Sequence, residues 1–174
     1  GRPDRVFERT GVFGPPGGTR EFVAMSSLPH ERPYANELVG LIRSRFPDFG
    51  IGVGGYPEVH QEAPNAAVDM DNLKRKVDAG AHSAITQYFY NADAYYRFID
   101  DCEKLGIDIP IVPGIMPIGR FSQLARFSDA CGAEIPRWMR KKLEGYGDDS
   151  DSIREFGLDV VTALCEDLLK NGAP

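Results

Sequence analysis

Apolar and polar positions along this chain predict short strands separated by longer helices. Residues 51–55 (IGVGG), 84–89 (AITQYF) and 109–112 (IPIV) are short apolar runs, the pattern of buried parallel strands. A weaker run, EFVAM at residues 21–25, predicts a strand upstream of them. Between and after these runs, apolar residues recur at the spacing of amphipathic helices. The predicted helices cover residues 34–46, 65–79, 92–105, 121–130, 136–144 and 152–170.

Strands that alternate with helices predict parallel β/α units joined by right-handed crossovers. Two architectures contain such units, the doubly wound open sheet and the (β/α)8 barrel of TIM type. A complete barrel needs about 250 residues, so the chain of 174 residues would supply about half of one. No glycine-rich dinucleotide fingerprint follows any predicted strand, which weakens the doubly wound alternative.

The beginning of the chain does not follow this pattern. Residues 1–20 show no clean periodicity and contain the segment PPGG, so they predict loop or disorder. We therefore expect a divergent or disordered segment over residues 1–30 and one α/β domain over residues 31–174.

Composition narrows the class of protein. The net charge of −6 argues against nucleic acid or an anionic membrane as the main partner. No apolar run approaches the roughly 20 residues of a membrane span, and the charged start has no signal-peptide core. Three cysteines without paired spacing indicate reduced thiols, so we expect a cytoplasmic protein.

Polar side chains gather where strands of a β/α barrel end, which is where barrels bind ligands. Tyr56, Glu58, His60 and Glu62 follow the first of the three apolar runs, and Gln87 ends the second. The Glu58, His60 and Glu62 spacing is compatible with a metal ligand set. The other histidines are isolated in the sequence and no second ligand cluster exists, so we expect no metal.

The helix between these two strands carries Asp69, Asn72, Arg75 and Lys76, which share one face because they lie at positions i, i+3, i+6 and i+7. Such a stripe is either a solvated surface or a clamp for an anionic, hydroxyl-rich ligand such as a nucleotide. Gln123 and Phe127, one helical turn apart, offer an amide and a ring that could flank a flat ligand, although plain packing is the commoner role of such a pair.

These residues also carry a family likeness. The segments YPEVH, DNLKRKVDAGA, AITQYF and GIDIPIVPGIMPI closely resemble methylenetetrahydrofolate reductase, from about residue 34 to residue 172. The resemblance implies about the second half of an FAD-bearing β/α barrel. Such an enzyme passes a hydride from NADH or NADPH through flavin to methylenetetrahydrofolate and forms methyltetrahydrofolate. Carried over by position, the FAD contacts fall on Tyr34, Ala35, Tyr56, His60, Asp69, Asn72, Arg75, Lys76 and Ala81, and the folate or nicotinamide contacts on Gln87, Gln123 and Phe127.

The sequence also departs from the family pattern at identifiable positions. The family's catalytic glutamate and flavin-side aspartate have no counterpart here, and MSSLP at residues 25–29 stands in the aspartate's place. The expected part-barrel has open sheet edges and an exposed apolar interior, so we expect a homo-oligomer. A ligand pocket with only half of its walls should bind FAD weakly. The alternative is a catalytically incomplete fragment that acts only as a flavin-binding or interaction module.

Overall fold

The computed structural model describes residues 12–13 and 34–174, which form a mixed α/β fold. Strands β2 (Gly52–Gly55), β3 (Ser83–Tyr88) and β4 (Ile111–Gly114) pair in parallel. Strand β1 (Val12–Phe13) pairs antiparallel with β2, so the sheet order is β1-β2-β3-β4. The parallel α/β pattern predicted from the sequence is therefore confirmed.

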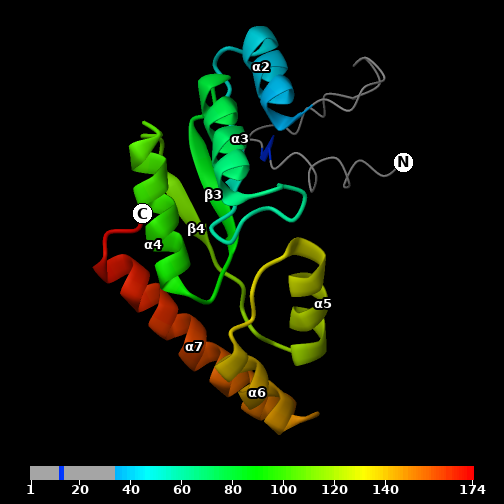
Figure 1. Cartoon of the computed structure of the whole chain (residues 1–174). Coiled ribbons are helices and arrows are strands. Elements are labelled where there is room, and N and C mark those ends of the chain that lie inside the picture. The colour runs from blue at the N-terminus through cyan, green and yellow to red at the C-terminus, as the bar shows by residue number, and fades with distance from the viewer. Residues whose placement is uncertain (1–11, 14–33) are drawn as a thin grey trace.

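Six helices are described, and they fall into two groups (Figure 1). Three alternate with the strands and three follow β4. Their bounds are α2 (Ala35–Arg45), α3 (Ala66–Asp78), α4 (Ala92–Lys104), α5 (Phe121–Cys131), α6 (Arg137–Tyr146) and α7 (Ser150–Lys170). Among the described helices, none combines the length and apolar character that crossing a bilayer requires.

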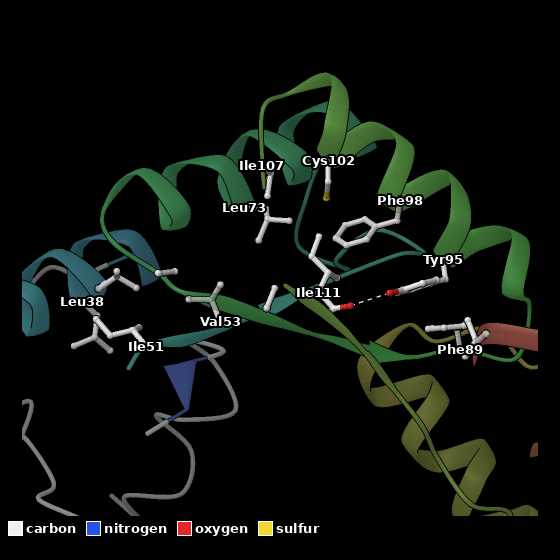
Figure 2. Close-up of a cluster of buried hydrophobic side chains, with 14 of the residues drawn as sticks. Leu38, Ile51, Val53, Leu73, Phe89, Tyr95, Phe98, Cys102, Ile107 and Ile111 are labelled. Atoms are coloured by element: carbon white, nitrogen blue, oxygen red, sulfur yellow. Dashed lines mark hydrogen bonds between the residues drawn. The ribbon is translucent and has the colours of Figure 1, made fainter. Parts of the chain in front are cut away.

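One face of the sheet packs against α3 and α4 and forms the main core (Figure 2). Val53, Ala84 and Ile111 are paired across the three parallel strands and are all buried. They meet Leu73 from α3 and Phe98 from α4 in the same cluster. This explains why the strands read as short apolar runs, because one face of each is fully removed from water.

Helices α3 and α4 do not cover the opposite face of the sheet. Ile85 and Val112, which alternate with the buried row, remain 40% and 38% exposed. Helices α5, α6 and α7 instead build a second core beyond the sheet, in which Ile118, Met139 and Leu143 are buried. The sheet therefore presents one packed face and one open face.

The predictions for the N-terminal segment are not confirmed. The strand expected at residues 21–25 lies outside the described residues. The expectation of loop or disorder over residues 1–20 is wrong at Val12–Phe13, which form β1. Two residues are too few to show strand periodicity, and their pairing with β2 is a long-range contact. The described parallel strands number three, so only part of the expected barrel is visible.

Replacing Tyr95 by Phe should lower the free energy of unfolding by about 1–2 kcal/mol. The buried Tyr95 hydroxyl donates to the carbonyl oxygen of Ile111 at 2.8 Å, which ties α4 to the edge strand β4 (Figure 2). Urea unfolding of the variant would measure the loss. Tyr96→Phe is the matched control, because that hydroxyl bonds Asp167 at an exposed position. Equal losses in the two variants would contradict the assignment.

Candidate functional site

The loop between β2 and α3, residues 56–65, brings three of the predicted site residues into contact. The rings of Tyr56 and His60 meet edge to face, with centroids 4.5 Å apart. The ammonium of Lys76, from the last turn of α3, lies 5.7 Å from the centre of the Tyr56 ring. An aromatic face, an imidazole and a cation thus meet at the carboxyl end of β2.

Asp69 joins this group through the backbone. Its Oδ2 accepts the N–H of His60 at 2.9 Å, and it stands in the first turn of α3, where the helix dipole favours a negative charge. Asn65 begins the helix by accepting the N–H of Val68 with its side chain. The loop and the helix start are therefore held as one unit.

The imidazole of His60 has a defined proton arrangement. Its Nδ1 lies 3.1 Å from the N–H of Glu62, which donates to it. An acceptor Nδ1 carries no proton, so the neutral ring carries its proton on Nε2. His60 can therefore donate one hydrogen bond from Nε2 to a ligand.

Lys76 is the most unusual member of the site, because it is a lysine with only 7% of its surface exposed. Its Nζ donates to the carbonyl oxygen of Gly54 on β2. None of the ion pairs among the described residues includes Lys76. Burial lowers the pKa of the ammonium to about 8, and the nearby charge of Asp69 offsets part of that shift. An anionic ligand would supply the missing partner for this cation.

The phenol of Tyr56 stays neutral at ordinary pH. Burial is the main cause that raises its pKa above 10.0, and the charges of Asp69, Cys131 and Glu62 add to the effect. Tyr56 therefore offers an uncharged ring face and a hydroxyl donor.

The backbone of the same loop contains a strained residue. Val59 has a φ of 69°, in the left-handed region that β-branched residues avoid. Such a conformation costs about 1–3 kcal/mol and persists only where neighbouring contacts hold it. No residue from 56 to 65 is fully buried, and hydrogen bonds from the Val59 N–H to Tyr56 O and from the His60 N–H to Asp69 hold the backbone here.

Gln87 lies on β3, where alternation along the strand puts it on the same open face as Ile85. Its Oε1 accepts the N–H of Tyr88 at 3.0 Å. The amide nitrogen has no acceptor among the described residues, so it can donate to a ligand. Gln87 thus lies near the end of β3, as its position in the sequence predicts, and its role as a substrate contact stays a prediction.

The remaining predicted residues lie outside these contacts. Tyr34 and Ala35 form the start of α2, where Tyr34 is 76% exposed. Asn72 and Arg75 are exposed on α3, while Ala81 is buried in the main core before the amino end of β3. The structure thus splits the predicted helix stripe: Asp69 and Lys76 turn toward the loop and Asn72 and Arg75 face solvent.

Gln123 and Phe127 lie one turn apart on α5, as their spacing predicts, and both side chains are exposed. The guanidinium of Arg126 lies 5.8 Å from the centre of the Phe127 ring. The two predicted side chains are therefore accessible to a ligand.

Two contacts beneath α5 were not predicted from the sequence. The hydroxyls of Tyr88 and Ser128 are 3.0 Å apart and buried, and the Tyr90 hydroxyl donates to Met116 O at 3.1 Å. The partners in these two contacts lie 40 and 26 residues apart, respectively, so no local pattern could indicate them. Among the described residues, no group of three or more His, Cys, Asp or Glu side chains could hold a metal ion.

Comparison with known proteins matches this arrangement to one family. The family model for methylenetetrahydrofolate reductase matches residues 15–174, and so begins earlier than the resemblance seen from residue 34. The 5,10-methylenetetrahydrofolate reductase of Escherichia coli K12 is 43% identical over 160 residues, which cover 89% of this chain and 54% of that enzyme. The Arabidopsis thaliana methylenetetrahydrofolate reductase (NADH) 1 is 38% identical over 168 residues, or 91% of this chain and 28% of that enzyme.

A solved structure shares the fold. It is an uncharacterized protein from Clostridium thermocellum that binds two copies of 5-methyl-5,6,7,8-tetrahydrofolic acid, with a TM-score of 0.57 and 23% identity. The match covers 100% of this chain and 60% of that one. The chain spans about half the length of the curated bacterial relatives it matches. With the family model covering nearly all of it, the chain belongs to the methylenetetrahydrofolate reductase family.

Proposed function

We propose that this chain supplies one half of an FAD-dependent reductase built as a (β/α)8 barrel. The reaction would transfer a hydride from NADH or NADPH to methylenetetrahydrofolate and form methyltetrahydrofolate. Family membership supports the reaction class. The observation that carries the flavin assignment is the buried ammonium of Lys76, which forms no ion pair among the described residues and lies beside the Tyr56 ring.

The residues at the end of β2 fit the groups of FAD. Lys76 offers a positive charge to the diphosphate, and His60 Nε2 offers a hydrogen bond. Tyr56 offers an apolar ring surface, and Asn72 and Arg75 are free to meet polar groups at the exposed edge of α3. FAD, when bound, supplies the redox chemistry by accepting and passing on the hydride.

The substrate side of the proposal rests on other residues. Gln87 on the open sheet face and Gln123 with Phe127 on α5 would hold the folate or the nicotinamide in turn. A reduced folate is also what the C. thermocellum structure binds, although it shares only the fold with this chain. We assign no catalytic acid or base to this chain.

The proposal also includes a cytoplasmic location and a homo-oligomeric state. The free cysteines Cys102, Cys131 and Cys165 suit a reducing cytoplasm. Among the described residues, the outer edge of β4 pairs with no strand, which suits a homo-oligomer.

A titration of the purified chain with FAD tests the function. We expect a saturable change in the visible flavin spectrum with weak affinity, because part of the pocket wall is supplied elsewhere in the longer relatives. Addition of NADH and of NADPH under anaerobic conditions should then bleach the bound flavin with the preferred donor. A flavin spectrum identical to that of free FAD at every protein concentration would contradict the proposal.

A further inference from the structure

The loop that carries Tyr56 and His60 is tied to a distant part of the chain by Glu58. Its Oε2 accepts the backbone N–H of Glu134 at 2.7 Å, across 76 residues of sequence. Glu134 belongs to the connection between α5 and α6. Figure 1 shows the loop after β2 extending toward the end of α5 where that connection starts.

The donor side of this contact is a firm anchor. Glu134 is exposed, but its neighbours Ala133 and Ile135 are 6% and 5% exposed and belong to the second core. A backbone N–H between two buried residues has little freedom to move. The carboxylate of Glu58 therefore attaches the loop to a fixed point.

Gly132 and Gln61 also approach each other closely, beside the hydrogen bond between Glu58 and Glu134. A Cβ built on Gly132 would lie 2.6 Å from Cγ of Gln61, and Gly132 has a φ of 76°. Gly132 suits both requirements, since it accepts a left-handed conformation and has no side chain to collide with the loop. The two segments are thus in contact at two points, Glu58 to Glu134 and Gln61 to Gly132.

The hydrogen bond from the His60 N–H to Asp69 fixes the loop to α3, and the Glu58 contact fixes it to a second element. Val59, directly after Glu58, holds the strained left-handed conformation, and none of residues 56–65 is buried deeply enough to anchor it. Burial raises the pKa of Glu58 above 4.5, while the Glu134 N–H acts in the opposite direction. The loop therefore keeps a partly desolvated carboxylate at this contact, where its cost is offset by a hydrogen bond to a charged acceptor.

We propose that Glu58 is a positioning residue, which fixes the loop of residues 56–65 to the α5–α6 connection and so sets where Tyr56 and His60 meet the flavin. Its action on the flavin rests on the proposed function, whereas the tether itself does not. Because α5 carries Gln123 and Phe127, the same contact sets the spacing between the flavin side and the substrate side of the site.

The test compares three substitutions at Glu58 in the full 174-residue chain. Glu58→Ala removes the acceptor, and Glu58→Asp keeps the charge but shortens the reach. Glu58→Gln keeps an acceptor oxygen at the original distance. Glu134→Ala is the matched control, because it removes the exposed side chain and leaves the N–H donor in place.

Amide hydrogen exchange in the absence of FAD measures directly how firmly the Glu58 contact holds the loop. We expect amide exchange in residues 59–63 to rise about tenfold in Glu58→Ala and Glu58→Asp, as for one lost hydrogen bond to a charged group. Glu58→Gln and Glu134→Ala should stay within about threefold of the parent. Unchanged exchange in Glu58→Asp, or a rise in Glu58→Gln as large as in Glu58→Ala, would overturn the proposal, and Glu58→Asp decides it if Glu58→Ala does not fold.

FAD titration measures how the loss of this contact changes FAD affinity. The dissociation constant should rise about tenfold in Glu58→Ala and Glu58→Asp and recover in Glu58→Gln. Faster exchange with unchanged FAD affinity would overturn the positioning role. If the parent chain binds no FAD, the proposed function fails, and the exchange result alone decides whether Glu58 tethers the loop.

Discussion

Replacing Lys76 by Met should weaken FAD binding by about 10- to 100-fold, while the folded state becomes no less stable. The loss corresponds to one charge-assisted hydrogen bond of about 1.5–3 kcal/mol. Met has a similar length but no charge, so the variant no longer buries an ammonium whose hydrogen-bond acceptor, within the described part of the chain, is a backbone carbonyl. Burying an ammonium without a paired charge costs free energy, so an apolar side chain of similar length should not lower the stability of the folded state. FAD titration and urea unfolding measure the two effects.

The pH dependence identifies the charge as the cause. The pKa of Lys76 is lowered to about 8, so FAD affinity of the parent should fall as pH rises through about 8 and the ammonium loses its proton. The free energy of unfolding should instead rise with pH in this range. Between about pH 8 and 10.5 the unfolded chain keeps the proton that the folded chain releases, so this group becomes less destabilising. The stability difference between Lys76→Met and the parent should therefore narrow across that window.

A neighbouring lysine provides the control for these measurements. Lys74 lies on the same helix and pairs with Asp78 at the surface, so Lys74→Met should leave FAD affinity within about twofold. Equal loss of FAD affinity in Lys74→Met and Lys76→Met would show that general charge, rather than the buried ammonium, attracts the ligand. A large loss of stability in Lys76→Met would assign it a structural role.

Replacing Gly114 by Ala should lower the free energy of unfolding by about 3 kcal/mol or more, the largest stability effect that we expect. A Cβ at Gly114 would overlap the carbonyl oxygen of Thr86 and lie 3.1 Å and 3.2 Å from the carbonyl carbons of Thr86 and Gln87. These are backbone atoms of the central strand, so they cannot turn aside. Gly114 also donates its N–H to Oγ1 of Thr86 at 2.9 Å, which a displaced strand would lose.

Gly119→Ala is the control for Gly114→Ala, because a Cβ there meets nothing within 4 Å. It should change stability by less than about 0.5 kcal/mol. Thermal unfolding followed by circular dichroism would compare the two variants. A Gly114→Ala midpoint close to that of Gly119→Ala would show that β4 can move away from β3 at little cost.

Much of the fold could be read from local patterns. The apolar runs at residues 51–55 and 84–89 correspond to β2 and β3, since a strand with a fully buried face must be apolar. The predicted helix 121–130 matches α5 to within one residue. β4 was displaced by two residues, because Ile109 and Pro110 precede the paired segment and Pro113 and Gly114 belong to it.

The site was predictable only in part. Tyr56, His60 and Asp69 could be named because strand ends and helix starts meet at one edge of a β/α sheet. The spacing on α3 did not reveal that Lys76 is buried while Arg75, its neighbour, is exposed. Burial depends on which way the helix faces the sheet, and that is set by packing between elements.

The sequence by itself determined the alternation of strands and helices, the edge of the sheet that carries polar residues, and the family. Each of these depends on residues that are near one another in the chain or follow a regular period. Only the tertiary structure decided that Glu58 meets the backbone of Glu134 and that Gly114 approaches Thr86 too closely for a side chain. Those contacts join segments 76 and 28 residues apart, and no local periodicity encodes which distant surfaces will meet.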